Sequence, residues 1–225
     1  MISEQAGFRG RRYSLLECMY GLPLVRLEIR SERLSGDGRP MQFPPLQSLI
    51  LAIFLLFPVP SAAEDIMIED FEVKPETRWR FFTDRVMGGV SSGQVKFLND
   101  GNKAYAHMTG NVSTENKGGF IQMRMELPDG APEDTVGVRL KVRGNGQTYF
   151  VHLRTSGTML PWQYYQASFE ATQDWTEVRL PLDAFKRSGQ LLRAVPRSNG
   201  IKSIAVVAFG RNHQAEVDVR EVGFY

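Results

Sequence analysis

The chain has 225 residues and a formal net charge of +2, and 42% of its residues are hydrophobic, including 14 Phe, 7 Tyr and 3 Trp. This apolar content excludes a disordered chain, and the near balance of basic and acidic side chains excludes an electrostatic attraction to nucleic acid or an anionic membrane. The single cysteine, Cys18, excludes an intramolecular disulfide and a thiolate metal site.

Residues 1–40 show no helical or strand period that persists, and we assign no fold to them. Residues 41–63 have the pattern of a secretory signal peptide: an apolar run ends at Phe57, prolines follow, and Ser61-Ala62-Ala63 offers a small-residue cleavage site. Because the apolar run is about nine residues long, against roughly 20 for a helix that spans a bilayer, cleavage after Ala63 is expected. The mature protein would then be exported, periplasmic or envelope-associated, with no transmembrane span.

Two features of the start affect this interpretation. A signal peptide seldom begins 40 residues into a chain, and from Met41 the n-region has no Lys or Arg, except for Arg39 just before it. We expect Met41 to be the initiator and residues 1–40 to be an extension of the gene model. The alternatives for residues 46–57 are a buried core helix and an uncleaved membrane anchor.

From Ile66 onward, apolar residues repeat mainly with a period of two and are separated by turn residues. The expected strands are 66–71, 94–98, 104–109, 120–127, 136–142, 149–153, 164–171, 176–182, 204–209 and 216–224. No long amphipathic helix interrupts them, so residues 64–225 are predicted to form one all-β domain, an antiparallel β-sandwich or jelly roll. Gly144-Asn145-Gly146 predicts a hairpin turn that makes 136–142 and 149–153 adjacent antiparallel strands.

Catalytic and metal-binding patterns are missing from the sequence. The three histidines, His107, His152 and His213, are scattered, and there is no nucleophile elbow. The pairs Glu69-Asp70 and Glu133-Asp134 are interpreted as solvated, because neighbours on a strand point to opposite faces; a weak calcium site is the alternative. We therefore expect that the protein is not an enzyme and that it binds no metal and no cofactor. A glycosidase would need two carboxylates about 5 to 9.5 Å apart, and no convincing pair can be nominated.

The segment from Trp79 to Gly93 is the most informative. Asp84 is placed to accept hydrogen bonds from the amides of the turn that follows, and Gly88-Gly89 permits positive φ angles or close backbone approach. Each residue therefore has a structural interpretation. The functional alternative is that Met87 projects from a tight loop as an apolar contact for a partner.

The string from Asp84 to Ser91 resembles the Asp-x-Val-Met-Gly-Gly-x-Ser signature of the NADH:ubiquinone oxidoreductase complex I intermediate-associated protein 30 family. Its matching residues are Asp84, Val86, Met87, Gly88, Gly89 and Ser91. The resemblance continues in order through 109–113, 118–120, 140–149 and 175–185. One departure is Asn145, where the family more often has Asp. Another departure is the targeting signal: known complex I assembly factors of the family work in mitochondria, whereas residues 41–63 resemble a Sec-type signal.

This resemblance implies a galactose-binding-like jelly roll without assigned catalytic residues, which binds ligands on a sheet face or through loops at one end. The polar and aromatic residues that would form such a face are Gln122, Arg124, Phe150, His152, Arg154, Trp162 and Tyr164, with Tyr165 and Gln166 nearby. Flat rings can stack on a sugar or peptide while polar groups orient it. The alternative is a sheet face covered by a loop.

Two functions follow from the resemblance. The first is a non-enzymatic assembly or chaperone-like factor that holds a protein partner through the Met87 loop or the polar sheet face. The second is an exported carbohydrate-binding module that recognises a glycan.

Overall fold

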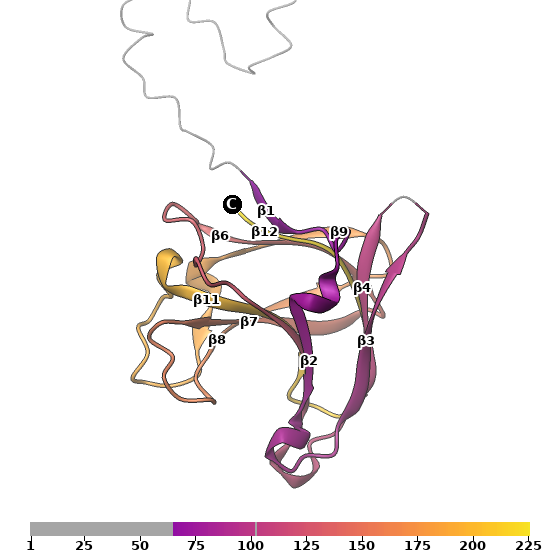
Figure 1. Ribbon diagram of the computed structural model, residues 1–225. Coiled ribbons are helices and arrows are strands. Elements are labelled where there is room, and N and C mark those ends of the chain that lie inside the picture. Colours follow the sequence, from indigo (N-terminus) through magenta and orange to yellow (C-terminus); the bar gives the residue numbers. More distant parts are fainter. Residues whose placement is uncertain (1–64, 102) are drawn as a thin grey trace, which may run out of the picture. The chain divides into compact units, whose positions relative to one another are not determined.

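A computed structural model of the chain describes residues 65–101 and 103–225, and these form two antiparallel β-sheets packed face to face (Figure 1). The expected gene-model extension, 1–40, and the expected signal peptide, 41–63, lie outside the described residues. Within the described part, the helices are short 3-10 turns, and none is long and apolar enough to cross a membrane. The prediction of an all-β antiparallel sandwich is confirmed.

We call the two sheets A and B. Sheet A has the order β3-β4-β12-β6-β9, and β1 also pairs with β12. Its strands are β1 (Ile66–Glu69), β3 (Ser92–Asn99), β4 (Ala104–Val112), β6 (Gly137–Gly144), β9 (Thr176–Pro181) and β12 (His213–Phe224). Sheet B has the order β10-β8-β7-β11-β5-β2. Its strands are β2 (Trp79–Thr83), β5 (Phe120–Glu126), β7 (Gln147–Thr155), β8 (Tyr165–Ala171), β10 (Lys186–Arg187) and β11 (Ile201–Phe209).

The core lies between the sheets and follows the period-two pattern of the strands. On β5, Ile121 and Met123 are fully buried, whereas the intervening Gln122 is half-buried on the opposite face. The same alternation buries every second residue of β8, and on β7 it buries Tyr149, Val151 and Leu153, although His152 on the opposite face is buried as well. Each fully buried Leu, Ile, Met or Phe side chain contributes about 1.5–3 kcal/mol, so this alternation fixes which face of each strand points inward.

The hairpin predicted at Gly144-Asn145-Gly146 is wrong in its pairing. β6 pairs with β12 and β9 in sheet A, whereas β7 pairs with β11 and β8 in sheet B, so this turn carries the chain from one sheet to the other. Gly146 has a φ of 73°, and the side-chain Nδ2 of Asn145 donates to the Gln214 carbonyl at 3.0 Å. Alternation shows which face of a strand is buried, but it does not identify the neighbouring strand.

Other details of the strand prediction also need correction. β2 and β10 were not predicted, and the first strand ends at Glu69 instead of residue 71. Val136 lies outside β6 and is 51% exposed. Arg139 is only 9% exposed, although the alternation along 136–142 predicts that it lies on the solvated face, opposite Val138 and Leu140. The Arg139 guanidinium donates to Glu221 Oε2 at 2.9 Å, because a buried charge needs a partner of opposite sign.

The interpretation of Glu69 as a solvated carboxylate is wrong. Glu69 is 3% exposed, and its oxygens accept hydrogen bonds from the Arg78 guanidinium at 2.6 and 2.8 Å, from Trp79 Nε1 at 3.0 Å and from the Phe71 amide at 2.7 Å. N–H donors therefore occupy the carboxylate, which ties β1 to β2. Among the described residues, no group of three or more His, Cys, Asp or Glu side chains could hold a metal ion.

Candidate ligand-binding site

The outer face of sheet B gathers polar and aromatic side chains from neighbouring strands. Gln122 on β5 lies opposite Val207 on β11, which lies opposite Phe150 on β7. One step along the pleat, Arg124 lies opposite Ala205, which lies opposite His152. Side chains directly opposite each other on one face have Cβ atoms about 4.5–5.5 Å apart, so these residues form a continuous surface.

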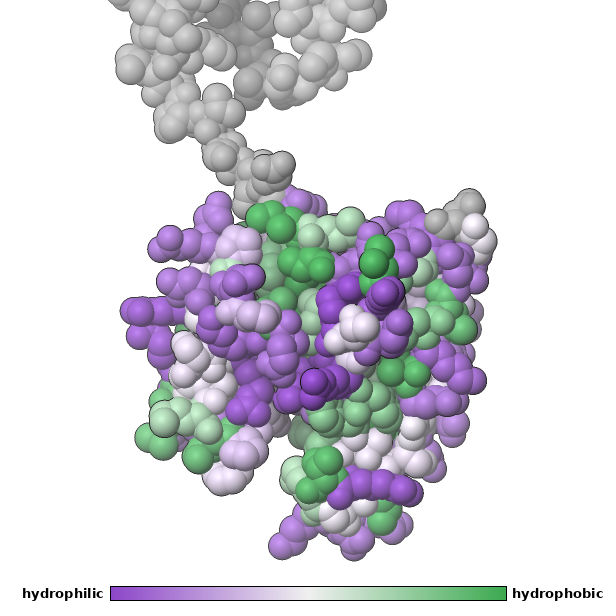
Figure 2. All heavy atoms as spheres, viewed as in Figure 1, coloured by the Kyte–Doolittle hydropathy of each residue, from purple (hydrophilic) through white to green (hydrophobic). Residues whose placement is uncertain are grey.

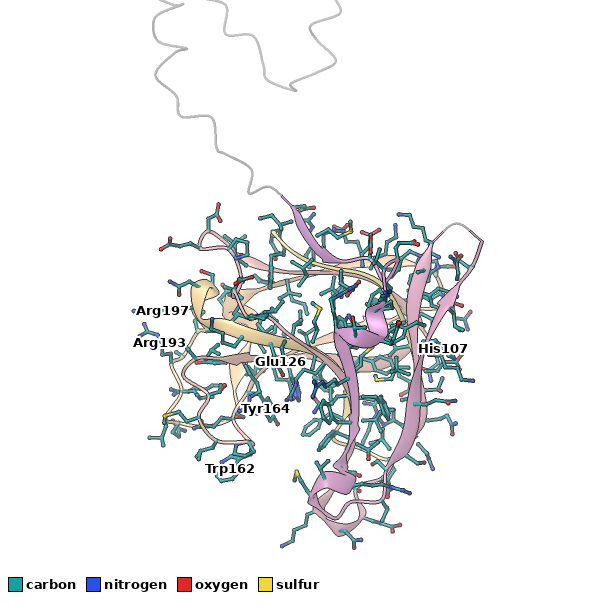
Figure 3. The ribbon with its side chains drawn as sticks, viewed as in Figure 1. His107, Glu126, Trp162, Tyr164, Arg193 and Arg197 are labelled. Carbon is teal, nitrogen blue, oxygen red and sulfur yellow. The ribbon has the colours of Figure 1, made fainter. Side chains whose placement is uncertain are left out.

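This surface contains a groove of about 460 Å³. Its floor is built from small residues of β11, Ser203, Ala205 and Val207, and larger side chains from β5 and β7 form its sides. The loop before β8 forms a further wall; in Figure 3, its Trp162 and Tyr164 lie on the side of sheet B that faces away from β6 and β12. The floor is low because the central strand carries small side chains where its neighbours carry long ones.

An aromatic cluster stiffens one side of the groove. The His152 ring stacks on the Tyr164 ring with a centroid separation of 4.1 Å and an interplanar angle of 9°, and Phe209 meets both rings edge-on. Burial lowers the pKa of His152 to about 4, although the hydrogen bond between its Nε2 and Gln166 Oε1 opposes this shift. The stack is therefore a neutral, flat wall at neutral pH.

Arg154 holds the loop that carries Trp162. Its guanidinium donates to the backbone carbonyls of Thr158, Leu160 and Pro161 at 3.3, 3.1 and 3.3 Å. Trp162 itself is 67% exposed, so its ring is available to a ligand without the loop having to move. Because the loop backbone is already held by Arg154, a ligand that contacts this ring does not have to order the loop.

A buried carboxylate anchors the opposite rim of the groove. Asp84, in η2 (Asp84–Met87), is 0% exposed and accepts hydrogen bonds from the Ser91 amide at 2.9 Å and from the Gly119 amide at 2.6 Å. The Ser91 hydroxyl donates to it at 2.5 Å. Burial opposes ionisation of Asp84, but these hydrogen bonds outweigh it and lower the pKa of Asp84 below its ordinary value. The carboxylate thus joins the η2 turn to the loop before β5.

The hydrogen bonds to the Asp84 carboxylate are sterically possible because glycines surround it. A Cβ added at Gly89 or at Gly118 would lie 2.3 Å from an atom of the Asp84 carboxyl group, and Gly88 has a φ of 87°. The predicted hydrogen bonding of Asp84 and the predicted positive φ or close approach at Gly88-Gly89 are confirmed. Each of these glycines is therefore required by the geometry of the turn.

The remaining signature residues point outward. Val86 is 72% exposed and Met87 is 64% exposed, and Met87 lines the rim of the groove. In Figure 2, hydrophobic residues lie on the surface of the tip at the bottom of the view, where η2 is found. The signature thus divides into a buried part, Asp84, Gly89 and Ser91, and an exposed apolar part, Val86 and Met87.

The profile of the family described as Complex I intermediate-associated protein 30 (CIA30) matches residues 70–217. The chain belongs to this family. The resemblance inferred from the Asp84–Ser91 string is therefore confirmed. A search of curated protein sequences found no match.

Solved structures with a fold similar to this chain include carbohydrate-binding modules. The family 11 module of the cellulosomal cellulase Lic26A-Cel5E of Clostridium thermocellum superimposes with a TM-score of 0.60 at 17% identity, covering 73% of this chain and 95% of the module. The family 11 module from Clostridium thermocellum in complex with a β-1,3-1,4-mixed-linked tetrasaccharide gives a TM-score of 0.59 at 16% identity, with coverages of 73% and 96%. At these identities the likeness shows a shared fold.

The structure brings most of the predicted ligand face of the CIA30 protein together. Predicted residues that line the groove are Gln122, Arg124, His152, Arg154, Trp162 and Tyr164. Phe150 lies on the same face but packs edge-on against Phe209, with centroids 6.0 Å apart, and is not among the lining residues.

Sequence reasoning missed several lining residues. The floor residues of β11 could have been found from their alternation with the buried Ile204, Val206 and Ala208. Lys117 ends the 3-10 turn η3 (Glu115–Lys117) and Ser188 follows β10, and no local pattern places them beside sheet B.

Proposed function

We propose that this CIA30 protein is a non-catalytic binding protein whose groove on sheet B holds an extended glycan. The observation that carries the proposal is the exposed Trp162 ring beside a groove whose sides also offer polar side chains such as Gln122 and Arg124. Sugar rings present both an apolar face and hydroxyl groups, so they need an aromatic platform together with polar partners.

The fold supports the same proposal. A family 11 module that shares this sandwich was solved in complex with a mixed-linked tetrasaccharide, so the architecture is compatible with glycan binding. The groove volume of about 460 Å³ lies within the range of small-molecule sites, about 300–1,000 Å³. The floor between Ser203 and Phe209 extends for roughly 20 Å along β11, because a strand rises about 3.3 Å per residue.

Titration calorimetry of the full chain against a panel of oligosaccharides tests this proposal. We expect at least one glycan to bind, and Trp162→Ala to weaken that binding by about 5-fold or more, since stacking of a ligand on one aromatic ring contributes on the order of 1–3 kcal/mol. Met159→Ala is the matched control, because Met159 is an apolar residue of the same loop and is 86% exposed. The proposal fails if no glycan binds, or if both variants change the affinity equally.

A second candidate function is an assembly or chaperone-like role that uses a protein partner, as the family description implies. The supporting observation is the pair of exposed apolar residues on the η2 turn, Val86 and Met87. An affinity purification from native cells would then recover a partner with the natural chain and with Val73→Asp, whose side chain is 67% exposed elsewhere. Met87→Asp would lose that partner. Equal recovery with both variants would refute this role.

Export is a separate proposal that decides which partners are available. It rests on the signal-like pattern of residues 41–63. N-terminal sequencing of the protein expressed from its own gene should give a mature chain that begins at Glu64, outside the cytoplasmic membrane. An intact or cytoplasmic chain would refute export.

A further inference from the structure

The groove has an uneven charge. Its lining includes three cationic side chains, Lys117, Arg124 and Arg154, and among the described residues that line it none is Asp or Glu. The whole chain has a formal net charge of only +2, with 27 basic and 25 acidic residues. The positive charge of the groove is therefore local, and it is not a consequence of a basic protein.

The two arginines lie on either side of the groove floor. Arg124 projects from β5 and Arg154 from β7, and between these strands β11 carries only the small Ser203 and Ala205 at this level. Two strands in the same sheet separated by a third are about 10 Å apart, which long side chains can bridge through one anionic group. Arg124 is also positioned by Phe82, whose ring centroid lies 4.9 Å from the guanidinium carbon.

The charges of these arginines are incompletely balanced within the protein. Arg124 Nε pairs with Glu126 Oε1 at 3.0 Å, but the Glu126 side chain is 61% exposed, so water and salt weaken this pair. Burial, with a further contribution from the charge of Arg124, lowers the pKa of Arg154, and the charge of Glu126 opposes this shift only in part. The two cations therefore repel each other across the groove, and an anion placed between them would relieve this repulsion.

We propose that the glycan held by this groove is acidic, and that a carboxylate or sulfate group of the sugar binds between Arg124 and Arg154 above Ser203 and Ala205. The inference rests on the proposed glycan-binding function. The planar guanidinium group of Arg124, whose Nε faces Glu126, can bind such an anion through its two Nη groups with two parallel hydrogen bonds. The Nη groups of Arg154 already donate to loop carbonyls, so Arg154 contributes mainly its charge. In this arrangement the sugar rings extend toward Trp162 and Tyr164. A neutral glycan would displace water from both arginines without supplying an opposite charge.

Calorimetric titration of the full chain with probes of equal length tests the inference. The probes are a neutral β-glucan tetrasaccharide, a hexuronic acid tetramer and a sulfated tetrasaccharide, each measured at 0.05 M and 0.5 M NaCl. We expect an acidic probe to bind at least about 10-fold more tightly than the neutral one at low salt, and to lose most of this advantage at high salt. Comparison of the carboxylated and sulfated probes identifies the anionic group.

Single-charge variants locate the effect. Arg124→Gln should weaken binding of the acidic probe about 10-fold and weaken binding of the neutral probe much less, so that the preference for the acidic probe is lost. Lys96→Gln, an exposed position on β3 of sheet A, is the matched control and should change neither affinity. Arg154 is unsuitable for this test because it also holds the Trp162 loop.

Several outcomes would overturn the inference. If the neutral probe binds as tightly as the acidic ones, or if Arg124→Gln and Lys96→Gln have equal effects, the glycan-binding proposal stands and the acidic preference is wrong. If a glutamate tetrapeptide binds as tightly as the hexuronic acid, with the same dependence on Arg124, the groove recognises charge without a sugar. If no probe binds, the glycan-binding proposal fails as well.

Discussion

Replacing Asp84 by Asn should destabilise the fold and disturb the rim of the groove. One oxygen of this fully buried carboxylate accepts from the Ser91 amide, and the other accepts from the Gly119 amide and the Ser91 hydroxyl. Because Asn carries an NH₂ group in place of one oxygen, at least one buried backbone N–H must face another donor. An unsatisfied buried N–H costs about 1–3 kcal/mol, and the loss of charge assistance in the remaining bonds adds about 1 kcal/mol.

We therefore expect Asp84→Asn to lower the free energy of unfolding at pH 7 by about 3 kcal/mol, which corresponds to a fall in Tm of about 6–12 °C for a domain of this size. Urea denaturation of the full chain followed by circular dichroism measures this loss. Asp129→Asn, at an exposed turn position, should stay within about 0.5 kcal/mol of the natural chain. A loss below about 1 kcal/mol for Asp84→Asn would refute the stabilising role of the hydrogen bonds to the Asp84 carboxylate.

The lowered pKa of Asp84 adds a pH dependence with a defined sign. A carboxylate whose pKa is lower in the folded state stabilises the fold fully above its unfolded pKa, about 3.9, and loses this contribution as the pH falls through the folded value. The difference in stability between the natural chain and Asp84→Asn should therefore shrink below about pH 4. A difference that is constant down to pH 2 would contradict this account.

Three further predictions follow from the same structure. Gly118→Ala should cost about 3 kcal/mol, because its Cβ would lie 2.3 Å from Asp84 Oδ2, whereas Gly157→Ala, with its nearest atom at 3.6 Å, should be nearly neutral in the same denaturation assay. Burial lowers the pKa of His152 from 6.5 to about 4. The free energy of unfolding should therefore fall by about 3 kcal/mol between pH 6.5 and pH 4, and His152→Gln should remove most of this pH dependence. A pH dependence that is the same in His152→Gln would refute this reasoning. Glu69→Gln should cost about 2–4 kcal/mol, because it leaves a guanidinium group without its charged partner, and a neutral result would contradict the role of Glu69 in joining β1 to β2.

Local patterns were sufficient to predict most strands, because the pleat places alternate residues on opposite faces whatever the rest of the chain does. They failed at β2, where Phe81 and Phe82 are both apolar but face different environments: Phe81 packs against the core, and Phe82 lies beneath Arg124. They also failed at Gly144-Asn145-Gly146, because a turn between two sheets has the same residues as a hairpin turn. The choice of strand partner depends on packing across the whole sandwich.

The candidate site was predictable to a similar extent. Gln122 and Arg124 were placed on an outward face by alternation, and the structure brings them into the groove. Asp84 was predicted to accept hydrogen bonds from amides of the turn that follows it, and the Ser91 amide, 7 residues farther along the chain, is such a donor. The Gly119 amide, 35 residues farther along the chain, could not be predicted from a local pattern. The double role of Arg154, which holds a loop as well as lining the groove, depends on carbonyl groups whose directions no sequence pattern specifies.

The central claim, that the groove of sheet B is a glycan site, is tested most directly by nuclear magnetic resonance of the indole N–H groups. The chain has 3 Trp residues: Trp162 is exposed at the groove, Trp79 is buried and bonded to Glu69, and Trp175 packs against Arg143 and Arg220. Titrating the ¹⁵N-labelled full chain with the hexuronic acid tetramer and with the neutral tetrasaccharide should shift the Trp162 indole signal in a saturable manner and leave the other two in place. An unchanged Trp162 signal with both sugars, or a larger shift at Trp175, would contradict the account.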